Sequence, residues 1–97
     1  MELKEFLDTI RGTIESIIQL VEQQRIKEAF HLYGQQVGII NGFIMFLDEN
    51  TVVDKEDLQE MIGFLVQSLE NEDAFLLKDV LQYALLDVIN QLEGVSE

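Results

Sequence analysis

Two short segments of the chain have residue types that could bind a metal ion. The first contains Glu28 and His31. This E-x-x-H pair would place a carboxylate and an imidazole on one face of a helix, as in di-iron bundles. Such a site needs two of these pairs and two further carboxylates, whereas the chain has one His. We therefore expect His31 to be a surface or rim residue, and we predict no metal site.

The second segment is the acidic run 48–50, which is followed by Asp54. Clustered oxygen ligands of this kind suit a calcium loop. A calcium loop that begins at residue 48 needs Gly at its sixth position and an acid at its twelfth, and the chain has Val53 and Gln59 there. Elsewhere, no Ser or Thr is paired with a base by its spacing. We expect weak, nonspecific cation binding at most, with no cofactor and no enzymatic activity.

Apolar residues recur every three or four positions in four segments, which predicts four helices at about residues 2–22, 25–48, 55–70 and 73–94. Asp54 is a good N-cap for the third helix, and Asn71 or Asp73 for the fourth. Because short turns join these helices, the sequence predicts an all-α fold, an up-down antiparallel four-helix bundle, in one domain over residues 1–97. The turn at 22–24 has no Gly or Pro, so the first two helices could instead run together with a kink.

The second helix has apolar residues on two faces. One face follows a strict spacing of four and three and is predicted to face the core: Ile26, Phe30, Tyr33, Val37, Ile40, Ile44 and Leu47. The residues predicted to be largely buried are Ile14, Ile17, Phe30, Val37, Ile44, Leu65, Leu81 and Val88. The opposite face consists of Leu32, Ile39, Phe43 and Phe46. A helix with two apolar faces is central in its domain or docked on a partner, so this second face should lie in a two-fold interface or under another helix.

Three glycines, Gly34, Gly38 and Gly42, are spaced by four along the same helix. Glycine inside a helix costs about 0.5–1 kcal/mol relative to Ala, which calls for an explanation. Small residues at this spacing let another backbone approach closely, and we expect close helix packing here. The alternatives are that the glycines only relieve crowding or that they form a shallow groove for a ligand.

The chain is strongly acidic, with a net charge of −13, and residues 47–97 contain thirteen acids and only two bases. The acids that we predict to flank a partner are Glu56, Asp57, Glu60, Glu70, Glu72 and Asp73. In an up-down bundle they should form two poles, at opposite ends. This charge repels nucleic acid and anionic membranes, so we expect neither as a partner. The alternative is that the acidity serves solubility alone.

The chain has no Cys, and its first residues lack the basic and apolar regions of a signal peptide. No apolar run approaches the roughly 18 residues of a membrane span. We therefore expect a cytoplasmic protein.

Residues 73–83 follow the pattern D-x-h-h-L-x-D-h-L-x-Y, where h is apolar. This pattern resembles one in small, uncharacterised bacterial acidic helical proteins. In size, acidity and number of helices the chain also resembles flagellar and type III export chaperones. That resemblance implies a small helical protein that wraps hydrophobic segments of its clients.

From these features we expect a non-enzymatic protein-protein interaction module, homodimeric, that binds a client or regulator through apolar helix surfaces. An export-chaperone-like protein and an immunity-like adaptor are two forms of this function. One alternative is a purely structural or regulatory domain that associates with itself. Another is a bundle that binds a small ligand or a metal.

Overall fold

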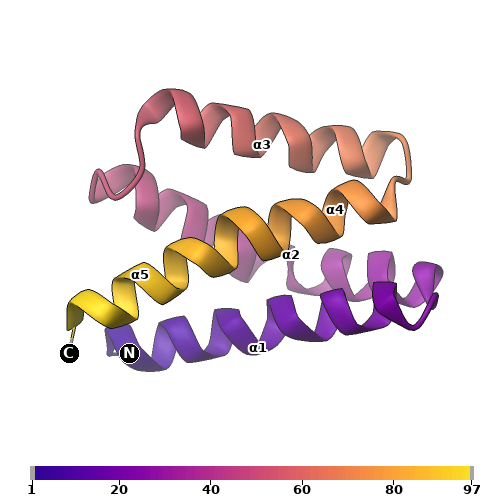
Figure 1. The fold of residues 1–97 in the computed structure, drawn as a ribbon, viewed down its shortest axis with the longest axis horizontal. Coiled ribbons are helices and arrows are strands. Elements are labelled where there is room, and N and C mark those ends of the chain that lie inside the picture. The colour runs from indigo at the N-terminus through magenta and orange to yellow at the C-terminus, as the bar shows by residue number, and fades with distance from the viewer. Residues whose placement is uncertain (1, 97) are drawn as a thin grey trace.

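A computed structural model describes residues 2–96, and in that part of the chain the only regular elements are helices. The first three are α1 (Leu3–Glu22), α2 (Ile26–Glu49) and α3 (Lys55–Glu70). The fourth runs without a break through α4 (Ala74–Val80), the π-helical turn η1 (Leu81–Leu85) and α5 (Leu86–Ser96). Successive helices run in opposite directions (Figure 1). The all-α prediction is confirmed, and α1 and α2 are separate helices.

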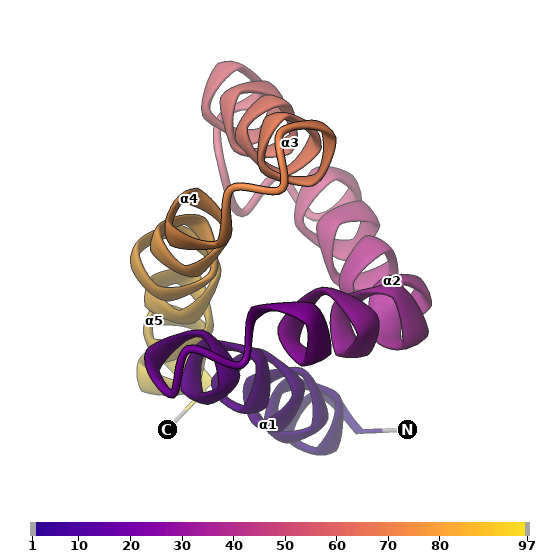
Figure 2. The same cartoon turned by 90° about the vertical axis from the view of Figure 1, so that its right-hand side faces the viewer.

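Viewed end-on, the helices surround a common centre (Figure 2). Helix α1 packs along α2 on one side and along the last helix on the other, and α3 packs along α4. Helices α2 and α3 contact each other much less than α1 and α2 do. One side of the bundle, between α2 and α3, is therefore loosely closed.

The three turns between helices share one backbone conformation. Two residues after the end of each of α1, α2 and α3 is a residue with positive φ that is not glycine: Gln24 (62°), Thr51 (50°) and Glu72 (50°). The next N–H then donates to the carbonyl five residues earlier, which is the Schellman pattern. These bonds are Arg25 to Leu20 (2.8 Å), Val52 to Leu47 (3.1 Å) and Asp73 to Ser68 (2.8 Å). The chain thus reverses direction without Gly or Pro.

The last helix begins at a side-chain cap, as its sequence predicts. The Asp73 carboxylate accepts a hydrogen bond of 3.0 Å from the N–H of Leu76. Asp54 is at the N-cap position of α3, but its side chain makes no capping bond. No helix within residues 2–96 is long and apolar enough to cross a membrane.

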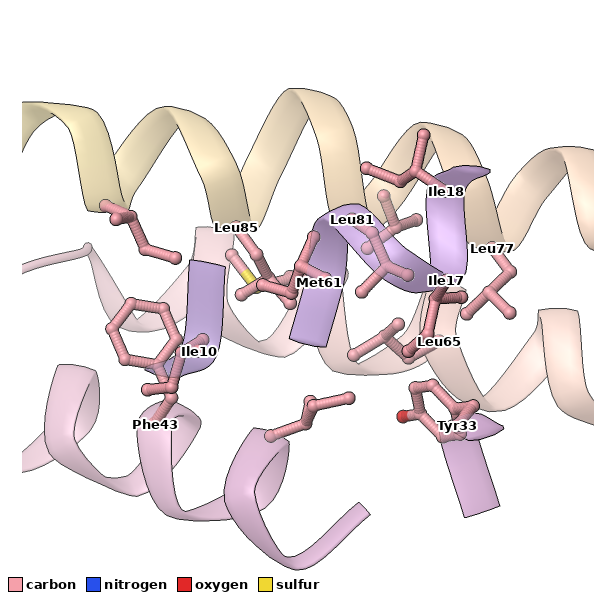
Figure 3. Packing of buried hydrophobic residues seen from close by; sticks show 14 of the residues in the cluster. Ile10, Ile17, Ile18, Tyr33, Phe43, Met61, Leu65, Leu77, Leu81 and Leu85 are labelled. Carbon is pink, nitrogen blue, oxygen red and sulfur yellow. The ribbon is translucent and has the colours of Figure 1, made fainter. Parts of the chain in front are cut away.

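The π turn in the last helix preserves the register of its apolar side chains with the core. Four residues spaced by four, Leu77, Leu81, Leu85 and Ile89, are fully buried. On a regular α-helix each step of four overshoots one turn by about 40°, so three such steps would rotate the row out of the core. A wider π turn takes up this excess. Figure 3 shows the three leucines beside Ile17 and Met61, in the centre of the bundle.

Candidate partner-binding groove

The orientation of α2 decides which of its two apolar faces is open to a partner. Its most buried line consists of Ala29, Tyr33, Ile40, Phe43 and Leu47, which runs between the two faces. Each face therefore lies on a flank of the helix, one beside α1 and one beside α3. Five of the eight residues predicted to be buried are buried: Ile14, Ile17, Leu65, Leu81 and Val88. The prediction is wrong for Val37, which is 36% exposed, while Phe30 and Ile44 are half-buried.

The face predicted for a partner or another helix lies on the α1 side. Phe43 is fully buried, while Leu32, Ile39 and Phe46 are half-buried. Phe6 of α1 packs edge-on against Phe43 and Phe46, with ring centroids 6.2 and 5.9 Å apart. This face is thus under another helix, and Phe43 has no surface left for a partner.

The glycine strip of α2 faces away from the core. Gly34 and Gly38 are exposed, Gly42 is partly exposed, and a Cβ on any of the three would meet no atom within 4 Å. The expectation of close helix packing at these glycines is therefore wrong within one chain. The reason is that α2 turns its two apolar flanks to α1 and α3, which leaves the strip in open space.

The opposite flank of α2 and the facing side of α3 form an apolar groove of about 490 Å³. Five large apolar side chains that line it are exposed: Val37 (36%), Met45 (60%), Ile62 (38%), Val66 (46%) and Leu69 (38%). Tyr33, Asn41, Ile44 and Leu65 complete the lining. Smaller recesses continue the groove at both ends, at Ile26 and Phe30 on one side and at Leu58 on the other. The groove therefore follows most of the length of the two helices.

Tyr33 forms part of the groove floor. It is only 4% exposed, and its hydroxyl makes no hydrogen bond with any protein group within residues 2–96. In Figure 3 its ring lies beside Leu65. Burial raises the pKa of the Tyr33 phenol above its usual value of 10.0, because a phenolate would lose its hydration. The Tyr33 ring is buried, while its hydroxyl, which no protein group in the described part of the chain pairs with, is a polar anchor point in an otherwise apolar groove.

The two ends of the groove carry charges of both signs. Lys27 and Glu72 lie at one end, and Asp48 and Lys55 at the other. All four are exposed, and none belongs to an ion pair among the described residues.

The acids predicted to flank a partner lie mostly away from this groove. Glu56, Asp57 and Glu60 are on the first turns of α3, while Glu70, Glu72 and Asp73 are around its other end. Figure 1 places these two groups at opposite ends of the bundle, as expected for two poles. Asp57 and Glu60 line a different recess, with Phe64 and Ala84, and only Glu72 borders the groove.

The residues considered for metal chemistry belong to no larger group of metal ligands in the described part of the chain. The Glu28 carboxylate accepts a hydrogen bond from Arg25, and His31 is exposed. Within residues 2–96 no group of three His, Asp or Glu side chains is placed to hold a metal ion.

Sequence reasoning missed the α3 half of the groove. Ile62 and Leu69 belong to the apolar pattern of α3, and Val66 is one turn from each. Together with Leu58 and Leu65 they make a face wider than one neighbour covers. The width of this apolar face is the feature of the sequence that indicates a surface open to a partner on α3. Helix α2 likewise has more apolar residues than one neighbouring helix covers.

Comparison with known proteins identifies a family and nothing closer. A family model described as "Domain of unknown function (DUF8042)" matches residues 1–95. No curated protein and no solved structure matches the chain.

Proposed function

The chain belongs to the DUF8042 family, and we propose for it a non-enzymatic role as a protein-interaction module. Its binding surface is the α2–α3 groove. The groove receives an apolar helical surface of another protein chain. This is the helix-in-groove mode, in which apolar side chains at helical spacing fill a hydrophobic trough.

One observation carries this proposal. Of the ten large apolar side chains exposed in the described part of the chain, five line the same groove. Exposed apolar residues scattered singly need no explanation, but a contiguous patch between two loosely packed helices marks an interaction site. The size of the groove and its length along two helices suit side chains from a helix.

A fluorescent reporter in the groove tests the proposal. The chain has no native Cys, so Met45→Cys gives a single site for an environment-sensitive dye at the groove rim. Titration with a synthetic amphipathic helical peptide of Leu and Lys should shift the dye emission to the blue as the groove is covered.

A matched pair of variants locates the binding. Val66→Lys puts a charge in the groove, whereas Phe64→Lys puts the same charge on the same helix, at 40% exposure, outside it. Burying an unpaired charge should weaken peptide binding at least about tenfold for Val66→Lys, with little change for Phe64→Lys. Equal effects of the two variants would contradict the groove as the binding surface.

A further inference from the structure

The charges at the ends of the groove are arranged in a self-complementary pattern. On α2, Lys27 is at one end and Asp48 at the other, while beside α3 the order is reversed, with Glu72 at the first end and Lys55 at the second. The groove ends thus hold two bases and two acids, in a chain with 6 bases and 19 acids. A groove shaped for a basic client would be bordered by acids. This one is bordered by equal numbers of both signs.

We propose that the occupant of the groove is a second copy of this chain. The two copies are related by a two-fold axis that is perpendicular to α2 and α3 and runs across the groove from one helix to the other. The proposal rests on the interaction function proposed above for the same groove. A two-fold axis in this direction lays α2 antiparallel over α2 of the second copy, and α3 over its α3. Lys27 then meets Asp48 of the second copy, and Lys55 meets Glu72 of the second copy.

The positions of the four charges define where the two-fold axis would cross α2 and α3, and both crossing points are near the middle of a helix. The midpoint of Lys27 and Asp48 falls between Val37 and Gly38, near the middle of α2. The midpoint of Lys55 and Glu72 falls next to Gly63, near the middle of α3. A Cβ on either glycine would meet nothing within 4 Å in one chain. Two helices can therefore approach closely at both crossing points.

Three of these charges are unfavourable for the isolated helices. Anionic side chains stabilise helix N-termini and cationic ones stabilise C-termini. Lys27 and Lys55 are in the first turns of α2 and α3, whereas Asp48 is in the last turn of α2 and Glu72 follows the end of α3. The first three are at the end that the helix dipole disfavours, while Glu72 also lies just before α4, where an acid is favourable. Contacts with a second copy account for the placement of Lys27, Lys55 and Asp48.

A charge exchange tests the arrangement. In sedimentation equilibrium from micromolar to submillimolar concentration, the wild-type protein should form dimers. Lys27→Asp places like charges opposite each other twice in the dimer, and it should raise the dimer dissociation constant about fivefold or more. The double variant Lys27→Asp with Asp48→Lys should return the constant to within about twofold of wild type.

The rescue cannot arise within one molecule. Residues 27 and 48 are about 30 Å apart along α2, too far for a direct contact. Both substitutions also suit the helix dipole, so helix content by circular dichroism should be maintained. Lys4→Asp on α1 makes the same charge change away from the groove, and it should leave the dissociation constant within about twofold of wild type.

Other outcomes separate the two proposals. A double variant that stays as weak as Lys27→Asp would overturn the two-fold arrangement. A wild-type monomer at all concentrations would overturn the second copy, while groove-dependent binding of the Leu/Lys peptide would still support the interaction function. A dimer that tolerates Val66→Lys as well as Phe64→Lys would overturn the second copy as the occupant of the groove.

Discussion

Tyr33 makes the stability of this protein sensitive to alkaline pH. Burial raises its pKa in the folded state above the value of 10.0 in the unfolded chain. The folded protein therefore keeps the phenol proton after the unfolded chain has lost it, so the free energy of unfolding is unaffected below pH 10 and falls as the pH rises further. Urea unfolding of wild type and Tyr33→Phe, followed from about pH 9 to about pH 11, should show a smaller loss for the variant.

A second tyrosine provides the control for this measurement. Tyr83 is 72% exposed and lies outside the groove, so Tyr83→Phe should retain the alkaline loss of wild type. Equal pH profiles of wild type and Tyr33→Phe would show that the phenol is hydrated in the folded state.

Thr51 occupies a backbone conformation that its side chain disfavours. Its φ is 50°, in the left-handed region, where a β-branched residue is an outlier. Left-handed backbone costs an L-residue about 1–2 kcal/mol, and glycine avoids this cost but loses more chain entropy on folding. We expect Thr51→Gly to raise the free energy of unfolding by about 0.5–1 kcal/mol in urea titration.

The exposed Thr9 of α1 is a suitable comparison, since it lies inside a regular helix. There the same substitution should lower the free energy of unfolding by a few tenths of a kcal/mol or more. A loss of stability in Thr51→Gly would mean that the threonine side chain contributes contacts that outweigh the backbone cost.

Among the helices, the last has an extra residue in its π turn. Deleting one residue from a regular helix rotates everything after it by about 100°, which would expose buried side chains. Deleting Gln82 from the π turn should instead restore a regular α-helix and keep the leucines on both sides in the core. We expect the Gln82 deletion to remain cooperatively folded in thermal melts, with a Tm within about 10 °C of wild type.

Deletion of Gln19, in the regular and exposed part of α1, is the matched control. It should abolish cooperative unfolding, because Val21 and the following turn would leave their positions. If the Gln82 deletion behaves in the same way, the π turn is needed for more than register.

Helix boundaries could be predicted because their signals are local. The expected helix at 55–70 coincides with α3, and Asp73 caps α4, since periodicity and capping act within a few residues. The rotation of α2 could not be predicted, because both of its faces are apolar and only contacts with distant residues choose between them. Phe6 covers one face, while the other lines the open groove between α2 and α3. The α2–α3 groove therefore depends on tertiary packing and is not set by the apolar pattern of α2 alone.

For the whole molecule, net charge sets how the proposed dimer responds to salt. Two copies with −13 each repel one another, and the molecule is 35 Å in its longest dimension. The Debye length falls from about 30 Å at 0.01 M to about 8 Å at 0.15 M salt. Exposed ion pairs contribute only about 0.2–1 kcal/mol each, so screening of the overall repulsion should dominate.

We therefore expect the dimer dissociation constant to fall as salt is raised over this range. Sedimentation equilibrium at several salt concentrations measures it. A complex with a basic partner would weaken under the same change. The sign of the salt effect thus distinguishes a second copy from a basic client, independently of any substitution.

The glycines of α2 that face open space have a consequence for amide hydrogen exchange. Gly34, Gly38 and Gly42 lower the intrinsic helix propensity over two turns, and no packing on that side compensates. Local opening should therefore cost less free energy in the middle of α2 than in α1, whose buried isoleucines are held on both sides. Among amides away from the helix ends, those from about residue 34 to 42 should exchange first, and their protection should rise when the groove is filled.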